Sequence, residues 1–182
     1  MYKRQRKVQS NKIIWIGPTP TVIKKMGDKL QAKEIAKKVN IPTLDTVEKV
    51  SLAKKIGFPL MIKAAAGGGG KGMRIVKDSA SLKDAAAAAK REAQSGFGDD
   101  RIFFERYIEK SRHIEVQILG DDKNVVHLGE RECSIQRRHQ KIIEESPSTR
   151  LSEELRLNIC EDAKRIAQAI KYTSAGTVEF LL

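Results

Sequence analysis

A run of four glycines, residues 67–70, lies between two short apolar segments and is flanked by Lys63 and Lys71. Consecutive glycines let backbone N–H groups approach an anion closely, and the two lysines add positive charge. The run formally satisfies G-x-G-x-x-G, but a dinucleotide-binding turn must lead into a helix, and the residues after Gly72 have a strand pattern. A P-loop is also excluded, because Met73 stands where lysine is required. We therefore predict a hairpin that covers phosphate groups, with a flexible surface loop as the alternative.

Two further positions carry groups suited to a nucleotide and its metal ion. Residues 105–108 end one predicted strand, where the backbone can offer a C=O and an N–H to the edge of a purine. Glu179 lies within an apolar strand, and a carboxylate there is costly unless a cation such as Mg²⁺ compensates it. The alternatives are an ordinary strand end for the first position and an outward-facing, exposed side chain for the second.

A basic segment, residues 136–141, has the composition of an anion-binding strand. If it forms one strand, alternation places Gln136 on one face and Arg137, His139 and Lys141 on the other. Basic residues that face one way at two-residue spacing suit an anionic substrate. The alternative is a solvated edge strand that its charges protect from pairing with another chain.

The elements that must position these residues follow from hydrophobic periodicity and turn signals. Helices are expected over residues 19–40, 46–56, 79–94 and 152–171, with Thr19, Thr46 and Ser152 as N-caps. Strands are expected over residues 12–16, 60–64, 73–76, 102–107, 114–118, 125–128 and 177–182. No element follows the last strand to pair with it, so the chain is expected to be a fragment of a longer protein.

The composition indicates a globular protein. Of 182 residues, 40% are hydrophobic and 32% charged, and no apolar run approaches the roughly 18 residues of a membrane span. The net charge of +12 is concentrated in residues 1–29, and the few aromatic residues form no stacking pattern, which argues against nucleic acid. Cys133 and Cys160 favour a reducing, cytoplasmic setting, and neither Cys133 nor His127 has the spacing of a zinc ligand.

Taken together and in order, these features resemble the ATP-grasp part of biotin carboxylase, the ATP-dependent component of acetyl-, propionyl- and methylcrotonyl-CoA carboxylases and of pyruvate carboxylase. The most specific stretch is Glu-Arg-Glu-Cys-Ser-Ile-Gln-Arg-Arg-His-Gln-Lys at residues 130–141. The other matching stretches are Ile16-Gly-Pro, Met26-Gly-Asp-Lys29, and residues 61–64, 67–74, 105–108, 112–117, 144–145 and 174–180. The resemblance covers nearly the whole chain from about Lys12.

The resemblance implies an α+β fold of the ATP-grasp type, truncated at both ends. Residues 1–28 would be the end of the N-terminal domain and the start of a connecting helix, and residues 29–44 that helix and a linker. Residues 45–107 would form the ATP-grasp lid. Residues 108–182 would form the first half of the central nucleotide-binding domain.

The resemblance also assigns roles to individual residues. Lys29 and Lys63 would bind the ATP phosphates, and Gly69 and Gly70 would belong to the phosphate lid. Lys141 would contact bicarbonate, and Glu179 would be a metal ligand. The remaining nucleotide contacts would come from Glu105, Arg106, Tyr107 and Ile108 at the adenine edge, and from His113, Gln136 and His139 around the nucleotide.

In the family that the chain resembles, bicarbonate attacks the γ-phosphate of ATP, and the resulting carboxyphosphate carboxylates biotin on a carrier protein or domain. This implies ATP with Mg²⁺ or Mn²⁺, a biotin carboxyl carrier, a carboxyltransferase subunit, self-association, and a cytoplasmic or mitochondrial-matrix setting. The family's next motif, an E-M-N segment, would follow Leu182, so the 182 residues alone are expected to bind ATP without catalysis. The alternative is a non-catalytic module that binds nucleotide or nucleic acid.

Overall fold

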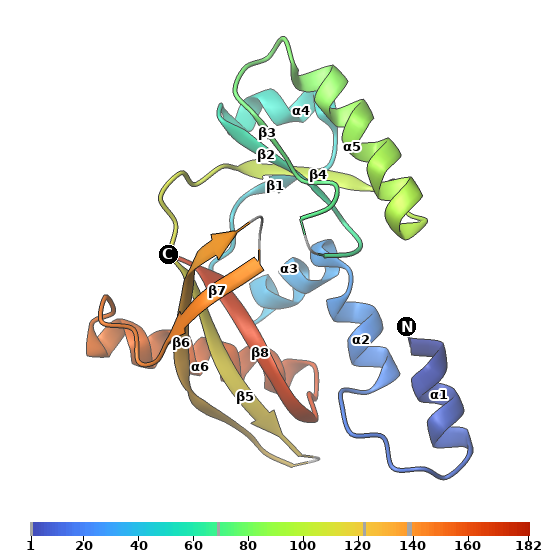
Figure 1. The fold of residues 1–182 in the computed structure, drawn as a ribbon, viewed down its shortest axis with the longest axis vertical. Helices are drawn as coiled ribbons and strands as arrows, with labels where there is room; N and C mark the ends of the chain where they lie inside the picture. The colour runs from blue at the N-terminus through green and yellow to red at the C-terminus, as the bar shows by residue number, and fades with distance from the viewer. Residues whose placement is uncertain (1, 69, 122, 138–139) are drawn as a thin grey trace. The chain divides into compact units, whose positions relative to one another are not determined.

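The computed structural model describes residues 2–68, 70–121, 123–137 and 140–182, and the chain divides into two compact units (Figure 1). The first unit holds the chain up to Met26, Gln31–Ile41 and Ser111–Leu182. The second unit holds Gly27–Leu30 and Pro42–Lys110, and so contains the segment predicted to be the lid. None of the helices in the described ranges has the length and apolar character needed to cross a membrane.

A four-stranded antiparallel sheet forms the second unit, with strand order β1-β4-β2-β3. The strands are β1 (Thr46–Val47), β2 (Leu60–Ala64), β3 (Arg74–Val76) and β4 (Ile102–Arg106). The helices α4 (Val50–Ala53) and α5 (Leu82–Phe97) bury Leu60 and Ile62 in the core, with a 3-10 turn over Lys54–Ile56. Because side chains alternate along a strand, Met61 and Lys63 lie on the other face of the sheet.

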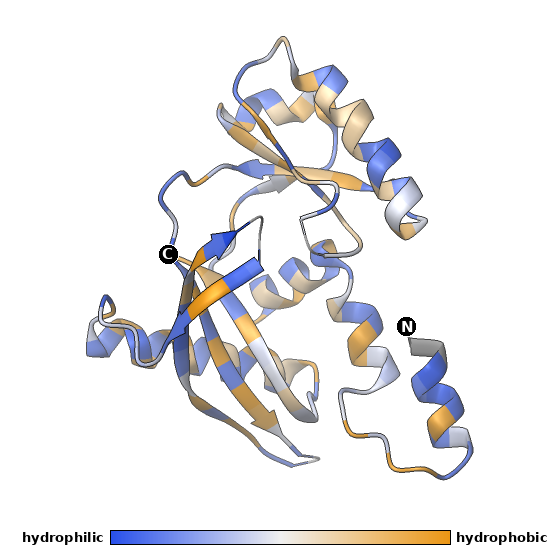
Figure 2. Cartoon of the chain, viewed as in Figure 1, coloured by the Kyte–Doolittle hydropathy of each residue, from blue (hydrophilic) through white to orange (hydrophobic). Residues whose placement is uncertain are grey.

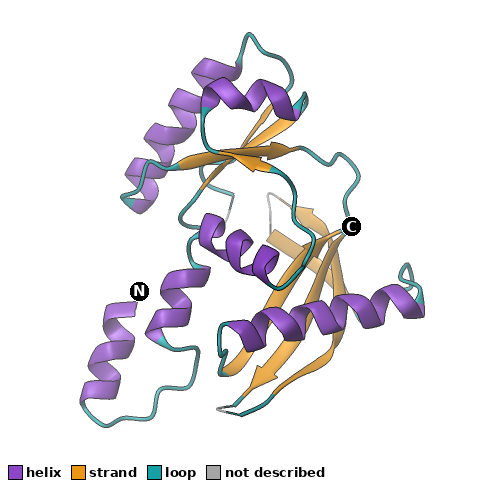
Figure 3. Cartoon of the chain, turned by 180° about the vertical axis from the view of Figure 1, so that it is seen from behind, coloured by secondary structure: helices purple, strands orange, loops and turns teal. Residues whose placement is uncertain are grey.

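The first unit contains a second four-stranded antiparallel sheet, with strand order β7-β6-β5-β8. Its strands are β5 (His113–Gly120), β6 (Val125–Arg137), β7 (Gln140–Glu145) and β8 (Ser174–Leu181). Helix α6 (Glu153–Ala169) lies along one face (Figure 3), where Ile114 and Val116 pack against Ile159 and Ala163. The opposite face of β5 therefore carries Glu115 and Gln117, as alternation requires.

Three helices precede these sheets in the chain: α1 (Tyr2–Ser10), α2 (Pro20–Met26) and α3 (Lys29–Lys38). Helix α1 is largely hydrophilic (Figure 2). Two predicted caps are confirmed, since the Thr19 hydroxyl accepts from the Val22 N–H (3.3 Å) and the Ser152 hydroxyl accepts from the Leu155 N–H (3.2 Å). The predicted helix over residues 19–40 is instead two helices, because the Asp28 carboxylate caps the second one by accepting from the Leu30 N–H (3.0 Å).

Two other predicted elements are wrong. Residues 12–16 form no strand, and Ile14 and Ile16 are 87% and 86% exposed; among the described residues, no strand lies alongside to pair with them. Thr46 does not cap a helix but lies in β1 opposite Glu105, and α4 begins four residues later at Val50. Residues 12–16 thus have a strand composition but no partner strand among the described residues. At Thr46, pairing with the distant Glu105 replaces the helix that the local pattern predicts.

The prediction of one continuous strand over residues 136–141 is also wrong. Strand β6 ends at Arg137, β7 begins at Gln140, and the two strands pair antiparallel. Gln136 is the register partner of Lys141, so the two side chains share a face instead of pointing to opposite faces. The segment contains no glycine, proline or asparagine, so no residue type in it indicates that the chain reverses direction.

Candidate functional site

The glycine run connects two antiparallel strands, which confirms the predicted hairpin. Strands β2 and β3 pair through Leu60 with Val76 and Ile62 with Arg74. Within the connection, Gly67, Gly70 and Gly72 have φ values of 82°, 75° and 70°. Glycine adopts this left-handed region without the strain that a Cβ brings, so these glycines set the path of the backbone.

We predict a large difference in stability between two neighbouring glycine-to-alanine variants. A Cβ at Gly67 would lie 2.1 Å from the Phe97 ring, at a φ of +82°, whereas a Cβ at Gly68 would meet no atom within 4 Å. Gly67→Ala should lower the free energy of unfolding by about 2–4 kcal/mol, and Gly68→Ala should change it by less than about 0.5 kcal/mol. Denaturant unfolding of both variants tests this, and equal losses would contradict the loop geometry.

Lys63, on β2, extends from the face of the sheet opposite α5 and forms an ion pair with Glu105 of β4. Glu105 is only 2% exposed, and its carboxylate is held against the Lys63 ammonium. The next three residues of the predicted adenine segment, Arg106–Ile108, line an open cavity of about 450 Å³ together with residues 56–59. The Tyr107 N–H is already used, because it donates to the Pro59 carbonyl (3.2 Å).

Lys29 lies at the start of the same glycine loop, although 38 residues separate it from Gly67. Its ammonium donates to the carbonyls of Ala64 (3.1 Å) and Gly67 (2.6 Å), and its backbone N–H donates to the Ala65 carbonyl (2.9 Å). Burial of the ammonium, and then the like charge of Lys63, lower the pKa of Lys29 below its usual value. The two predicted phosphate ligands are thus close enough to repel each other, and a phosphate group would relieve that repulsion.

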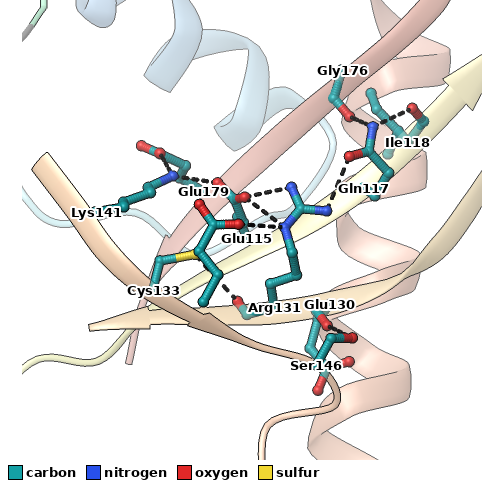
Figure 4. Close-up of polar contacts among 11 residues, drawn as sticks. Glu115, Gln117, Ile118, Glu130, Arg131, Cys133, Lys141, Ser146, Gly176 and Glu179 are labelled. Carbon is teal, nitrogen blue, oxygen red and sulfur yellow. Dashed lines mark hydrogen bonds and ion pairs between the residues drawn. The ribbon is translucent and has the colours of Figure 1, made fainter. Parts of the chain in front are cut away.

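In the first unit, the sheet face away from α6 carries a row of charged side chains (Figure 4). Glu115 is the register partner of Arg131 on β6 and of Glu179 on β8, so all three share this face. Lys141 of β7 completes the row by donating to Glu179 (2.6 Å) and to Glu115. Arg131 donates to Glu115 through Nε (2.8 Å) and to Gln117 (3.0 Å). Four strands therefore supply one connected network.

Glu115 and Lys141 keep their charges at neutral pH. Glu115 is 5% exposed, and its burial raises the pKa of the carboxyl, but hydrogen bonds from Lys141 and Arg131 outweigh burial and hold that pKa below its usual value. Burial likewise lowers the pKa of Lys141, and the bonds to Glu115 and Glu179 outweigh it, so the net shift is upward. Lys141 is therefore a fixed ammonium group, suited to hold an anion and not to act as a base.

Of the carboxylates in this row, Glu179 fits a divalent cation best. Its side chain is 64% exposed, and Lys141 engages one carboxylate oxygen, Oε1. Mg²⁺ is held in nucleotide sites by one or two carboxylates together with phosphate oxygens, which this arrangement allows. A second group, Glu115 with Cys133 and Glu144, has ligand atoms within 4.8 Å of one another.

That second group does not fit a metal ion. Arg131 lies 3.4 Å from Glu144 and also binds Glu115, which Lys141 binds as well, so two protein cations already neutralise the carboxylates. Burial raises the pKa of the Cys133 thiol to about 11, so the thiolate that binds metals is scarce. Glu179 remains the candidate for the ion.

Comparison with known proteins decides what kind of domain this is. Residues 23–182 match the family described as carbamoyl-phosphate synthase L chain, ATP binding domain. The chain belongs to this family. The ATP-binding domain is 49% identical over 179 residues to the mitochondrial propionyl-CoA carboxylase alpha chain of Homo sapiens, and 50% identical over 179 residues to biotin carboxylase of Nostoc sp.. Each match covers 93% of this chain but only 25% and 40% of those relatives.

Solved structures of the same class match the fold closely. The biotin carboxylase–beta-gamma-ATP complex from Campylobacter jejuni superposes with a TM-score of 0.96 at 43% identity, over 100% of this chain and 43% of that one. The biotin carboxylase domain dimer of 2-oxoglutarate carboxylase from Hydrogenobacter thermophilus, in complex with MgADP, ADP and bicarbonate, gives a TM-score of 0.91 at 43% identity, over 97% and 41%. The predicted α+β ATP-grasp fold and the resemblance to biotin carboxylase are both confirmed.

Most of the predicted site residues fall into two groups, one in each unit of the structure. Lys29, Lys63, Gly70 and residues 105–108 belong to the second unit, near the glycine loop and the end of β4. His113, Gln136, Lys141 and Glu179 belong to the first unit. His113 lies two residues from Glu115 on the same strand face, and the Gln136 side chain donates to the Cys133 carbonyl (2.8 Å). Gly69 and His139 lie outside the described residues.

Two members of the charged row were not predicted as site residues. Glu115 lies between the buried residues Ile114 and Val116. This alternation was a signal in the sequence that its carboxylate lies on the opposite face of the strand and has a role other than core packing. Arg131 carried no comparable signal, because its partner Glu115 is 16 residues away and only the strand register brings them together.

Proposed function

We propose that the full-length protein catalyses the ATP-dependent carboxylation of biotin by bicarbonate. The observation that carries this proposal is the position of Lys141, an ammonium group fixed between Glu115 and Glu179, in a domain whose relatives are biotin-dependent carboxylases. The chain spans between a quarter and two fifths of those relatives, so the activity is proposed for the full-length protein and not for these residues alone.

We assign nucleotide-binding roles to residues within each unit. Lys29, Lys63 and the backbone N–H groups of the glycine loop bind phosphates, and residues 105–108 meet the adenine through their backbone. His113, Gln136 and His139 surround the nucleotide. Glu179 holds Mg²⁺ or Mn²⁺, which neutralises charge on the phosphate oxygens. In this assignment residues 45–107 act as the lid.

The reaction then proceeds in two steps. Lys141 holds bicarbonate, one of whose oxygens forms a bond to the γ-phosphorus of ATP as the bond to ADP breaks, which gives carboxyphosphate. The ureido nitrogen of biotin then forms a bond to the carboxyl carbon as the bond between that carbon and the phosphate oxygen breaks, and the released inorganic phosphate takes the ureido proton. The protein acts mainly by positioning: Glu115 and Arg131 fix Lys141, and the loop N–H groups meet the charge on the transferred phosphoryl group.

The proposed activity requires partner proteins or domains. A biotin carboxyl carrier protein or domain supplies the biotin, and a carboxyltransferase subunit uses the carboxylated product. Self-association and a cytoplasmic or mitochondrial-matrix location are part of the same proposal. The alternative, a non-catalytic module that binds nucleotide or nucleic acid, finds no support among the relatives.

The test of this function is the dependence of ADP formation on both co-substrates. In the full-length protein with MgATP, ADP release should require bicarbonate and should rise further when free biotin is added. Coupled spectrophotometric measurement of ADP gives the result directly. ADP formation that proceeds equally without bicarbonate would contradict the proposal and favour a simple ATPase.

A further inference from the structure

The segment Gly27–Leu30, which joins α2 to α3, belongs to the second unit and is bonded to the start of the glycine loop. The Lys29 N–H donates to the Ala65 carbonyl, and the Ala65 N–H donates to the Arg101 carbonyl, both at 2.9 Å. Ala65 is fully buried, so neither bond is exposed to competition from bulk water. Three segments that are distant in the sequence therefore meet beside the loop.

A buried carboxylate ties two of these segments together through side chains. Asp28 is 7% exposed and accepts from the Arg101 guanidinium (2.9 Å) as well as from the Leu30 N–H (3.0 Å). Arg101 is itself held by Asp99, which accepts from its Nε (3.0 Å) and Nη2 (2.6 Å). The bonds to Asp99 and then to Asp28 raise the pKa of Arg101, so the guanidinium stays charged at any physiological pH.

The arrangement has a direct consequence for Lys29. Asp28 precedes Lys29 in the chain, so fixing Asp28 fixes the point from which the Lys29 side chain extends toward the Ala64 and Gly67 carbonyls. A long, flexible lysine side chain otherwise loses much conformational freedom when it binds a phosphate. Prior fixing of the backbone at Asp28 removes part of that cost.

We propose that Asp28 and Arg101 are positioning residues for phosphate binding, which hold Lys29 at the start of the glycine loop. They touch no nucleotide in this account and act only through Lys29. The inference rests on the proposed function, in which Lys29 binds the ATP phosphates, and it adds two residues that the phosphate site needs.

The test is a double-mutant cycle in the full-length protein, measured as the Kd for MgATP by calorimetry. Arg101→Ala should weaken binding roughly five- to tenfold in the wild-type background, and by less than about twofold when Lys29 is already methionine. Asp28→Asn should behave in the same way. Arg165→Ala is the matched control, since it also removes a half-exposed arginine paired with an aspartate, Asp162, but on α6. It should leave the Kd unchanged.

A second measurement needs no nucleotide. Hydrogen exchange of the Lys29 amide should be faster in Arg101→Ala than in the wild type by more than the change in global stability accounts for, because the Lys29–Ala65 bond loses its support. Faster exchange together with a cycle that collapses in the Lys29→Met background supports the inference. Unchanged exchange, or equal losses of affinity in both backgrounds, would overturn it. A wild-type protein that binds no MgATP would instead refute the proposed function, and the exchange result would still decide whether Asp28 and Arg101 hold Lys29.

Discussion

Replacing Lys141 by alanine in the full-length protein should lower bicarbonate-dependent ATP cleavage by about 10²–10³-fold, the usual cost of removing one preorganised electrostatic group. The Kd for MgATP should change by less than about threefold, because Lys141 binds Glu115 and Glu179 on the strand face of the first unit, and the proposed phosphate ligands are other lysines, Lys29 and Lys63. The effect should therefore appear in kcat and in the KM for bicarbonate. Steady-state kinetics at varied bicarbonate, with calorimetric MgATP binding, separates the two.

The fold of the Lys141 variant needs a control, because the substitution leaves a buried carboxylate with one fewer cation. Glu115 keeps Arg131 as a partner, so the protein should remain folded, and an unchanged MgATP affinity would itself show this. Lys164→Ala, which breaks a surface ion pair between Lys164 and Glu161 on α6, is the matched lysine control and should retain full activity. A Lys141 variant that loses MgATP affinity as much as bicarbonate use would contradict the assignment.

The second large effect is expected at Lys63. Lys63→Ala should weaken MgATP binding by about 10- to 100-fold, in line with the loss of a hydrogen bond from a charged donor to phosphate. The single variant also leaves Glu105 buried without this cation, which adds a stability cost of its own. The double variant Lys63→Met with Glu105→Gln removes both charges, so its MgATP affinity reports the lysine alone.

The two lysines should differ in which substrate they affect. At saturating MgATP, the Lys63 double variant should recover most of its bicarbonate-dependent turnover, whereas the Lys141 variant should not recover at any MgATP concentration. Initial rates over a wide MgATP range give both results. Loss of the same magnitude in nucleotide affinity for both variants would count against separate phosphate and bicarbonate roles.

Local signals in the sequence were sufficient for much of the fold. The Thr19 and Ser152 caps, and the hairpin around the glycines, depend on residues within a few positions of one another, and each is confirmed. Where an element depends on pairing with a segment that is distant in the sequence, the prediction from local patterns was wrong. Residues 12–16 have a strand composition but no neighbouring strand among the described residues, and Thr46 pairs with Glu105 instead of capping a helix.

The same distinction applies to the candidate site. Lys29, Lys63, Lys141 and Glu179 were predicted because each lies in a short motif that resembles a known family. The contacts that give these residues their properties could not be predicted from local sequence patterns, because they join segments that are distant in the sequence. The sheet register brings Arg131 and Glu179 to opposite sides of Glu115, and the separation between Asp28 and Arg101 is 73 residues. The reversal of the chain between Arg137 and Gln140 was missed for the same reason, since Gln136 and Lys141 share a face only through cross-strand pairing.

The most direct test of the central claim follows the oxygen atoms of bicarbonate. The full-length protein is supplied with MgATP, biotin and ¹⁸O-labelled bicarbonate, and the inorganic phosphate is examined by mass spectrometry. If bicarbonate attacks the γ-phosphate to form carboxyphosphate, one ¹⁸O atom per turnover should appear in phosphate. Phosphate that contains no ¹⁸O, with its new oxygen drawn from water, would show that the protein hydrolyses ATP without forming carboxyphosphate, and would contradict the account.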